Sequence, residues 1–219
     1  MISITIDDKQ VKAMLKAMPK QAGRAAEQAL DFTAVRIADE ERTQMLRRFD
    51  NPTQYTLNSL KVTKTKGHNM TAIVGFKEPE RMGQHYLLPQ VEGGERKLKG
   101  FERALGNYEF IPSKHLKLNA QGNITHATAK NAIASKGTNK GGYVYLSKLK
   151  GNALPPGVYQ RFKTDRAAIT PQGLKPILLQ GRTGHAVRPL LPFYEIAHTA
   201  FDRYFTAKFT AEFNRMMGR

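Results

Sequence analysis

The sequence of 219 residues contains no cysteine and no long apolar run. Without cysteine, disulfide frameworks, cysteine-ligated zinc sites and thiol nucleophiles are excluded. No stretch approaches the roughly 18 apolar residues of a membrane span. Residues 1–8 alternate and carry acids, unlike the basic-then-apolar pattern of a signal peptide. We therefore expect a protein that is made and kept in the cytosol, with no membrane partner.

Acidic residues are also scarce. The 18 Asp and Glu stand against 35 Lys and Arg, which gives a net charge of +17. This excess indicates an acidic partner, which is nucleic acid, an anionic membrane or an acidic protein surface. A basic protein without any polyanionic partner is the alternative.

The charge is most one-sided between Glu109 and Asp165, where nine basic residues lie and no acid occurs. Flexible lysines suit phosphate contact without base reading. Tyr143 and Tyr145 fall in this window, and we expect them to pack in a strand rather than to stack on bases. Seven lysines are candidates for facing DNA or an acidic partner: Lys114, Lys117, Lys130, Lys136, Lys140, Lys148 and Lys150.

Motifs for catalysis and metal binding are missing as well. The six histidines include no His-Glu-x-x-His spacing, and neither a Gly-x-Ser-x-Gly elbow nor a phosphate-binding glycine loop occurs. Asp39, Glu40 and Glu41 are expected on the solvated face of a helix, and Asp165 in a turn. We therefore expect no enzyme, no metal and no cofactor. A small nuclease that uses Glu40 or Asp165 is the alternative.

Helical periodicity predicts two long helices. In residues 20–49, an alanine-rich stripe recurs with a period of 3.6 residues, and the helix ends at Asp50-Asn51-Pro52. A second amphipathic helix begins near Pro192. Its polar face mixes acids and bases, which argues against a membrane-surface helix. Its aromatic stripe is expected to form core or a subunit interface: Phe193, Phe201, Phe205, Phe209 and Phe213.

Alternating patterns predict strands at residues 2–6, in a hairpin over 60–76, and at 157–162 and 174–179. Pro176 predicts that the last strand starts late or lies at a sheet edge.

These elements predict an α+β fold, in which a small, mostly antiparallel sheet is packed by a long N-terminal helix and a C-terminal amphipathic helix. Residues 1–77 and 154–219 are expected to form a single core domain. Residues 78–153, rich in glycine and lysine, are expected to form a basic, loop-rich insertion or arm with short helices near 101–105 and 124–135.

The segment Pro156-Gly157-Val158-Tyr159-Gln160-Arg161-Phe162 is followed by Lys175-Pro176-Ile177-Leu178 and by Arg188-Pro189-Leu190-Leu191-Pro192-Phe193, which leads into the last helix. This succession resembles the Pro-Gly-aromatic strand and terminal helix of the minor tail protein Z-like family of tailed phages. The alanine-rich helix of residues 22–49 matches the helix near the start of that family. Residues 86–96 and 101–105 also look like phage tail sequence.

The resemblance implies a structural virion protein with no catalytic residues. Its role would be tail completion at the neck, where the tail joins the head, in contact with other tail, neck and connector proteins. It would act as a homo-oligomeric ring, with a hexamer as one candidate, around the path of the genomic DNA. The lysines would then attract DNA without sequence preference, or dock acidic neighbours. The alternative is a sequence-independent DNA-binding protein.

Overall fold

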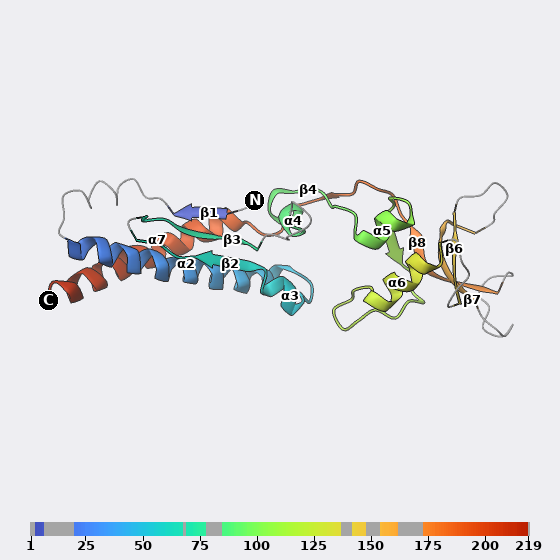
Figure 1. Cartoon of the computed structure of the whole chain (residues 1–219), viewed down its shortest axis with the longest axis horizontal. Helices are drawn as coiled ribbons and strands as arrows, with labels where there is room; N and C mark the ends of the chain where they lie inside the picture. The colour runs from blue at the N-terminus through green and yellow to red at the C-terminus, as the bar shows by residue number, and fades with distance from the viewer. Residues whose placement is uncertain are drawn as a thin grey trace. The chain divides into compact units, whose positions relative to one another are not determined.

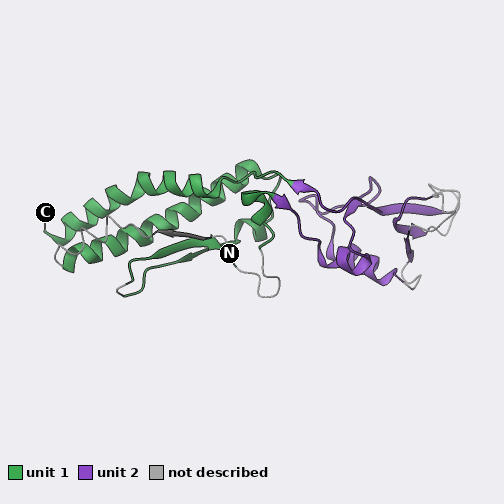
Figure 2. Ribbon diagram, turned by 90° about the horizontal axis from the view of Figure 1, so that it is seen from above, with its two compact units in different colours: residues 1–93, 187–219 green, residues 94–186 purple. Residues whose placement is uncertain are grey.

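The structure is a computed structural model. It describes residues 3–6, 20–67, 69–77, 85–136, 142–147, 154–161 and 173–218. The chain divides into two compact units (Figure 2): unit 1 comprises residues 1–93 and 187–219, and unit 2 comprises residues 94–186. Long helices and small antiparallel sheets confirm the predicted α+β class.

Unit 1 contains a three-stranded antiparallel sheet with β3 (Ala72–Phe76) between β1 (Ser3–Ile6) and β2 (Leu60–Thr63). Val74 of β3 pairs with Ile4 on one side and Val62 on the other. The N-terminal strand and the hairpin are thus confirmed. His68, within the predicted hairpin, lies outside the described residues.

Two long helices of unit 1, α2 (Lys20–Arg48) and α7 (Phe193–Met216), lie side by side and antiparallel (Figure 1). Polar contacts fix this register, since Gln28 binds Arg215 and Glu40 binds Arg203. The face of α2 turned inward is lined by fully buried alanines, which allow close approach of the helices. Both predicted helices are confirmed. Among the described residues, no helix is long and apolar enough to cross a bilayer.

Two short helices complete unit 1. Helix α3 (Gln54–Leu57) follows α2 directly, and the Thr53 hydroxyl caps it by accepting a hydrogen bond from the Thr56 amide at 3.1 Å. Helix α4 (Leu88–Glu92) is tied to the chain that leads into α7, because the Gln90 carbonyl accepts hydrogen bonds from the Leu190 and Leu191 amides. The shared core of unit 1 is therefore built from segments at both ends of the chain.

Unit 2 contains a four-stranded antiparallel sheet in the order β5-β8-β7-β6. Its strands are β5 (Phe110–Pro112), β6 (Tyr143–Leu146), β7 (Gly157–Arg161) and β8 (Leu174–Gln180). Two helices, α5 (Gly100–Leu105) and α6 (His126–Ala134), pack on each other and close a second core. That core consists of Phe101, Leu105, Phe110, Ala132, Val158, Ile177 and Leu178. The two-residue strands β4 (Gly94–Glu95) and β9 (Ala186–Val187) pair with each other.

The observed unit boundaries differ from the predicted domain boundaries. Residues 154–186 were expected in the core domain with residues 1–77, yet β7 and β8 pair with β5 and β6 inside unit 2. Conversely, residues 85–93 belong to unit 1. The alternating pattern of a strand specifies which face is buried but not which sheet the strand joins. The expected loop-rich insertion is therefore a folded unit with its own sheet and core.

The prediction for Pro176 was wrong. β8 starts at Leu174, before the proline, and it lies between two other strands. Proline has no backbone N–H to donate, but β5 pairs only with Leu178–Gln180, so Pro176 has a strand partner on the β7 side alone. On that side a bulge pairs Val158 with Leu178 and Tyr159 with Pro176, so that Ile177 is skipped.

Candidate functional site

The positive charge is concentrated in unit 2. Its 93 residues include sixteen Lys and Arg and four Asp and Glu, a net charge of +12, whereas unit 1 has nineteen and fourteen, a net charge of +5. In the described part of unit 2, Glu95 is the one exposed acid. Nine basic side chains are exposed there: Lys97, Lys99, Arg103, Lys114, Lys117, Lys130, Lys136, Arg161 and Arg182. We call these nine residues the basic surface.

The other two described acids of unit 2, Glu102 and Glu109, are turned inward. Glu102 is 1% exposed and forms two hydrogen bonds of 2.9 Å with the Arg96 guanidinium. It also accepts hydrogen bonds from the backbone amides of Lys99 and Phe110, at 2.6 and 3.3 Å. Burial alone would raise the pKa of Glu102, but these hydrogen bonds and the charge of Arg96 outweigh it and lower the pKa.

Glu109 continues this network. Its Oε1 lies 3.7 Å from Arg96, and its Oε2 lies 2.9 Å from Nδ1 of His185. Both carboxylates are therefore enclosed by the fold and face the Arg96 guanidinium. The burial of these two acids adds to an excess of basic residues that unit 2 already has by composition.

Four of the seven predicted lysines lie in the described residues, and all four are exposed. Lys114 and Lys117 stand on the connection between β5 and α6. This connection is held at its start by the Ser113 hydroxyl, which donates to the Pro176 carbonyl at 2.5 Å. Further along, the Asn119 side chain accepts hydrogen bonds from the amides of Gln121 and Asn123. The two lysines are thus carried by an ordered loop, which limits the entropy lost when they bind.

The other two described lysines belong to the region of α6. Lys130 is exposed on the helix, whereas the Nζ of Lys136, just after it, donates to the Ala104 carbonyl of α5 at 2.8 Å. Lys136 therefore has a structural contact as well as an exposed charge. Lys140, Lys148 and Lys150 lie outside the described residues.

The aromatic residues occupy mainly structural positions. Phe193 and Phe205 are buried in the core of unit 1, and Phe201, Phe209 and Phe213 are half-buried. Four of the five rings form a stacked series along α7, with centroid distances of 4.8, 6.2 and 6.0 Å. In unit 2, Tyr143 and Tyr145 pack against its core, as predicted.

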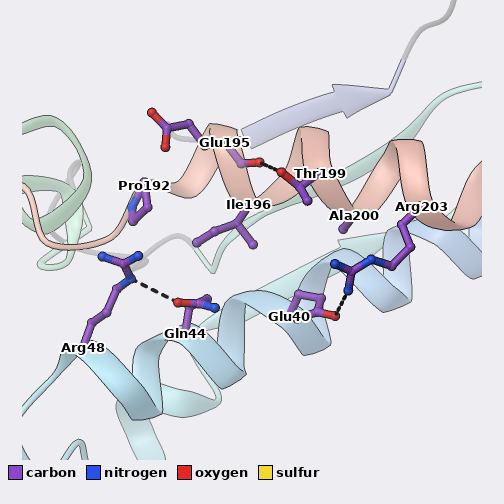
Figure 3. Close-up of a pocket in the computed structure, with 9 residues that line it drawn as sticks. All are labelled: Glu40, Gln44, Arg48, Pro192, Glu195, Ile196, Thr199, Ala200 and Arg203. Atoms are coloured by element: carbon purple, nitrogen blue, oxygen red, sulfur yellow. Dashed lines mark hydrogen bonds and ion pairs between the residues drawn. The ribbon is translucent and has the colours of Figure 1, made fainter.

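An open groove of about 250 Å³ lies between α2 and α7 in unit 1 (Figure 3). Three of its four charged side chains are hydrogen-bonded: Glu40 accepts hydrogen bonds from Tyr204 at 3.1 Å and Arg203 at 3.4 Å, and Arg48 binds Gln44 at 3.1 Å. The hydroxyl of Thr199 donates to the carbonyl of Glu195. Thr199, the one alcohol among the lining residues, is thus bonded to a backbone carbonyl and not to a side-chain base of the kind that activates a nucleophile.

The acidic cluster on α2 differs from the prediction at one position. Glu41 was expected on a solvated face, but it is fully buried, and neither carboxyl oxygen has a hydrogen-bond partner among the described residues. It lies four residues after Ile37 and four before Met45, on the buried stripe of the helix. Burial raises the pKa of Glu41 to about 9. The proposed nuclease residue Asp165 lies outside the described residues.

No group of three or more His, Asp or Glu side chains in the described ranges is arranged to hold a metal ion. Comparison with known proteins finds no matching family model, no matching curated protein and no matching solved structure.

Proposed function

We propose that this chain is a structural, non-enzymatic protein of a tailed-phage virion, which assembles at the neck to complete the tail around the path of the DNA. The segregation of charge in unit 2 supports the DNA contact, because an exposed basic surface attracts a polyanion without reading its sequence. The sequence resemblance to the minor tail protein Z-like family supports the place in the neck. The paired α2 and α7 of unit 1 supply a rigid body for subunit contacts.

The first test concerns the DNA contact. We expect Lys114→Gln, Lys117→Gln and Lys130→Gln, combined in one full-length variant, to weaken duplex DNA binding about 10- to 100-fold. The slope of log affinity against log salt concentration should decrease in magnitude by up to about 3, because each lost phosphate contact removes about one released counterion. Fluorescence anisotropy over a salt series measures both quantities. Lys136 is left unchanged because it also binds the Ala104 carbonyl.

A matched control comes from unit 1, where Lys61, Lys64 and Lys66 are equally exposed. Replacing these three by glutamine removes the same net charge from the chain. The proposal requires that this control retain most of the affinity and the salt slope. Equal losses in the two variants would show that only net charge matters and would contradict a dedicated basic surface.

The second test concerns assembly. Mass photometry of the purified chain, alone and with tail and neck proteins of the same phage, should show ring-sized assemblies or recruitment into a tail complex. A monomer that ignores every tail component yet binds DNA would contradict the virion role. It would favour the second candidate, a sequence-independent DNA-binding protein, which the basic surface supports equally.

A further inference from the structure

Six aromatic rings form a continuous series in unit 1, which we call the ring stack: Tyr55, Tyr86, His85, Phe76, Phe193 and Tyr194. Successive centroids are 5.9, 4.6, 4.7, 5.2 and 5.9 Å apart. Phe76 and Phe193 anchor the stack in the core, where they are 6% and 0% exposed. At one end Tyr55 is 74% exposed, although large rings are normally covered.

The rings next to Tyr55 are held in place. The Tyr86 hydroxyl donates to Oγ1 of Thr56 at 3.2 Å, and the Tyr86 ring lies at 21° to that of Tyr55. His85 stacks on Phe76 with an interplanar angle of 5°. Burial lowers the pKa of His85, so its ring is neutral at pH 7 and packs as an apolar ring. Tyr55 therefore rests on a preorganised support and has one face open for another flat ring.

Two exposed cations flank the helix that carries Tyr55. Nε of Arg42 donates to the carbonyl of Leu57, the last residue of α3, at 3.3 Å. The backbone amide of Lys77 donates to the carbonyl of Ser59 at 2.7 Å, just beyond that helix. The ion pair of Arg42 with Asp39 is exposed and 3.9 Å long, a pair that adds little in water. Among the described residues, no strong ion pair therefore occupies Arg42, and Lys77 is exposed directly after β3.

We propose that Tyr55 is a stacking platform for a base of single-stranded nucleic acid, with Arg42 and Lys77 placed to contact the adjoining phosphates. The Tyr55 and Tyr86 rings, at 21° to each other, favour a flat ligand that continues the stack at its exposed end. The flanking cations and the net charge of +17 favour a base carried on phosphodiesters over the aromatic side chain of a protein partner. This site goes beyond the proposed function, which needs only phosphate contacts in unit 2.

The test uses the full-length chain and a short fluorescent oligothymidylate. Tyr55→Ala should weaken binding about tenfold, because the variant loses one stack between a base and an aromatic ring. Affinity for an abasic oligonucleotide of equal length should not change, since that strand keeps its phosphates but has no base to stack. Tyr194→Ala is the matched control, because Tyr194 is an exposed tyrosine at the other end of the same stack.

The outcomes separate this site from the proposed function. Equal binding of the oligothymidylate by wild type and Tyr55→Ala would overturn the platform, even if the lysine variant of unit 2 still loses duplex affinity. Unchanged oligothymidylate binding together with loss of self-assembly in Tyr55→Ala would assign the tyrosine to a protein interface instead. A loss restricted to base-bearing strands, with duplex affinity intact, would establish the platform whatever the role of unit 2.

Discussion

Replacing Arg96 by methionine is expected to destabilise unit 2 by about 3–5 kcal/mol, because the substitution leaves a buried carboxylate without its charged partner. Glu102 would lose two hydrogen bonds of 2.9 Å from the guanidinium and keep only those from two backbone amides. Hydrogen exchange of the full-length chain checks this prediction. Amides of β5, β7 and β8 should exchange faster, whereas those of α2 in unit 1 should not change.

The effect of Arg96→Met should depend on pH. The folded-state pKa of Glu102 is lowered, so the stability that its carboxylate contributes is present above its ordinary pKa and is lost as pH falls through the lowered value. The difference between wild type and Arg96→Met should therefore be full at pH 7 and shrink in acid.

Two further variants test whether the unpaired carboxylate of Glu102 causes the loss of stability in Arg96→Met. Arg103→Met removes an exposed arginine from α5 and should leave exchange almost unchanged. In the Arg96→Met background, Glu102→Gln removes the stranded charge and should restore part of the stability. If Arg96→Met left exchange in β5, β7 and β8 at the wild-type rate, the network would not stabilise unit 2.

Replacing Glu41 by methionine is expected to stabilise unit 1, by about 3 kcal/mol at pH 7. Glu41 has a pKa of about 9 in the folded chain and 4.5 as its ordinary value. Between these values the folded state holds one more proton than the unfolded state, so stability falls by about 1.4 kcal/mol per pH unit. The methionine variant has no such loss of stability. The difference in free energy of unfolding between this variant and wild type should therefore widen from pH 5 to pH 8.

Urea unfolding followed by ellipticity at 222 nm measures this effect, since α2 and α7 supply most of the helix. Glu41→Gln should also remove the pH dependence, yet gain less than methionine, because it buries an amide without a partner. Glu195→Met replaces an exposed glutamate on α7 and should show no pH-dependent gain. An advantage of Glu41→Met that stays constant from pH 5 to pH 8 would contradict the raised pKa.

The long helices and most strands of the described residues could be predicted because their signals are local. The stripe of α2 and the phenylalanines of α7 repeat with the helical period, and Pro192 immediately precedes the first residue of α7. The choice of partner is not local. Nothing in residues 157–161 distinguishes a strand of unit 1 from a strand that pairs with β6 and β8 of unit 2.

In the candidate site, too, the features with a local signal could be predicted and those that depend on distant residues could not. The excess of lysines was visible in the sequence, and every described lysine predicted to face a partner is exposed. The burial of Glu102 and Glu109 was not visible, since it depends on Arg96 and His185, and His185 is distant in the chain. Glu41 was misplaced because its chemistry was given more weight than its spacing from Ile37 and Met45. The ring stack joins four separate segments, so no single stretch of sequence shows it.

The pairing of α2 with α7 also sets an order of events during synthesis. The ribosome makes α2 early, then all of unit 2, and only afterwards α7, which packs along α2. Until Phe193 and the residues after it emerge, α2 lacks its long helical partner, while every residue of unit 2 has already been made. A chain interrupted before Phe193 would thus keep the basic surface and lack a closed unit 1.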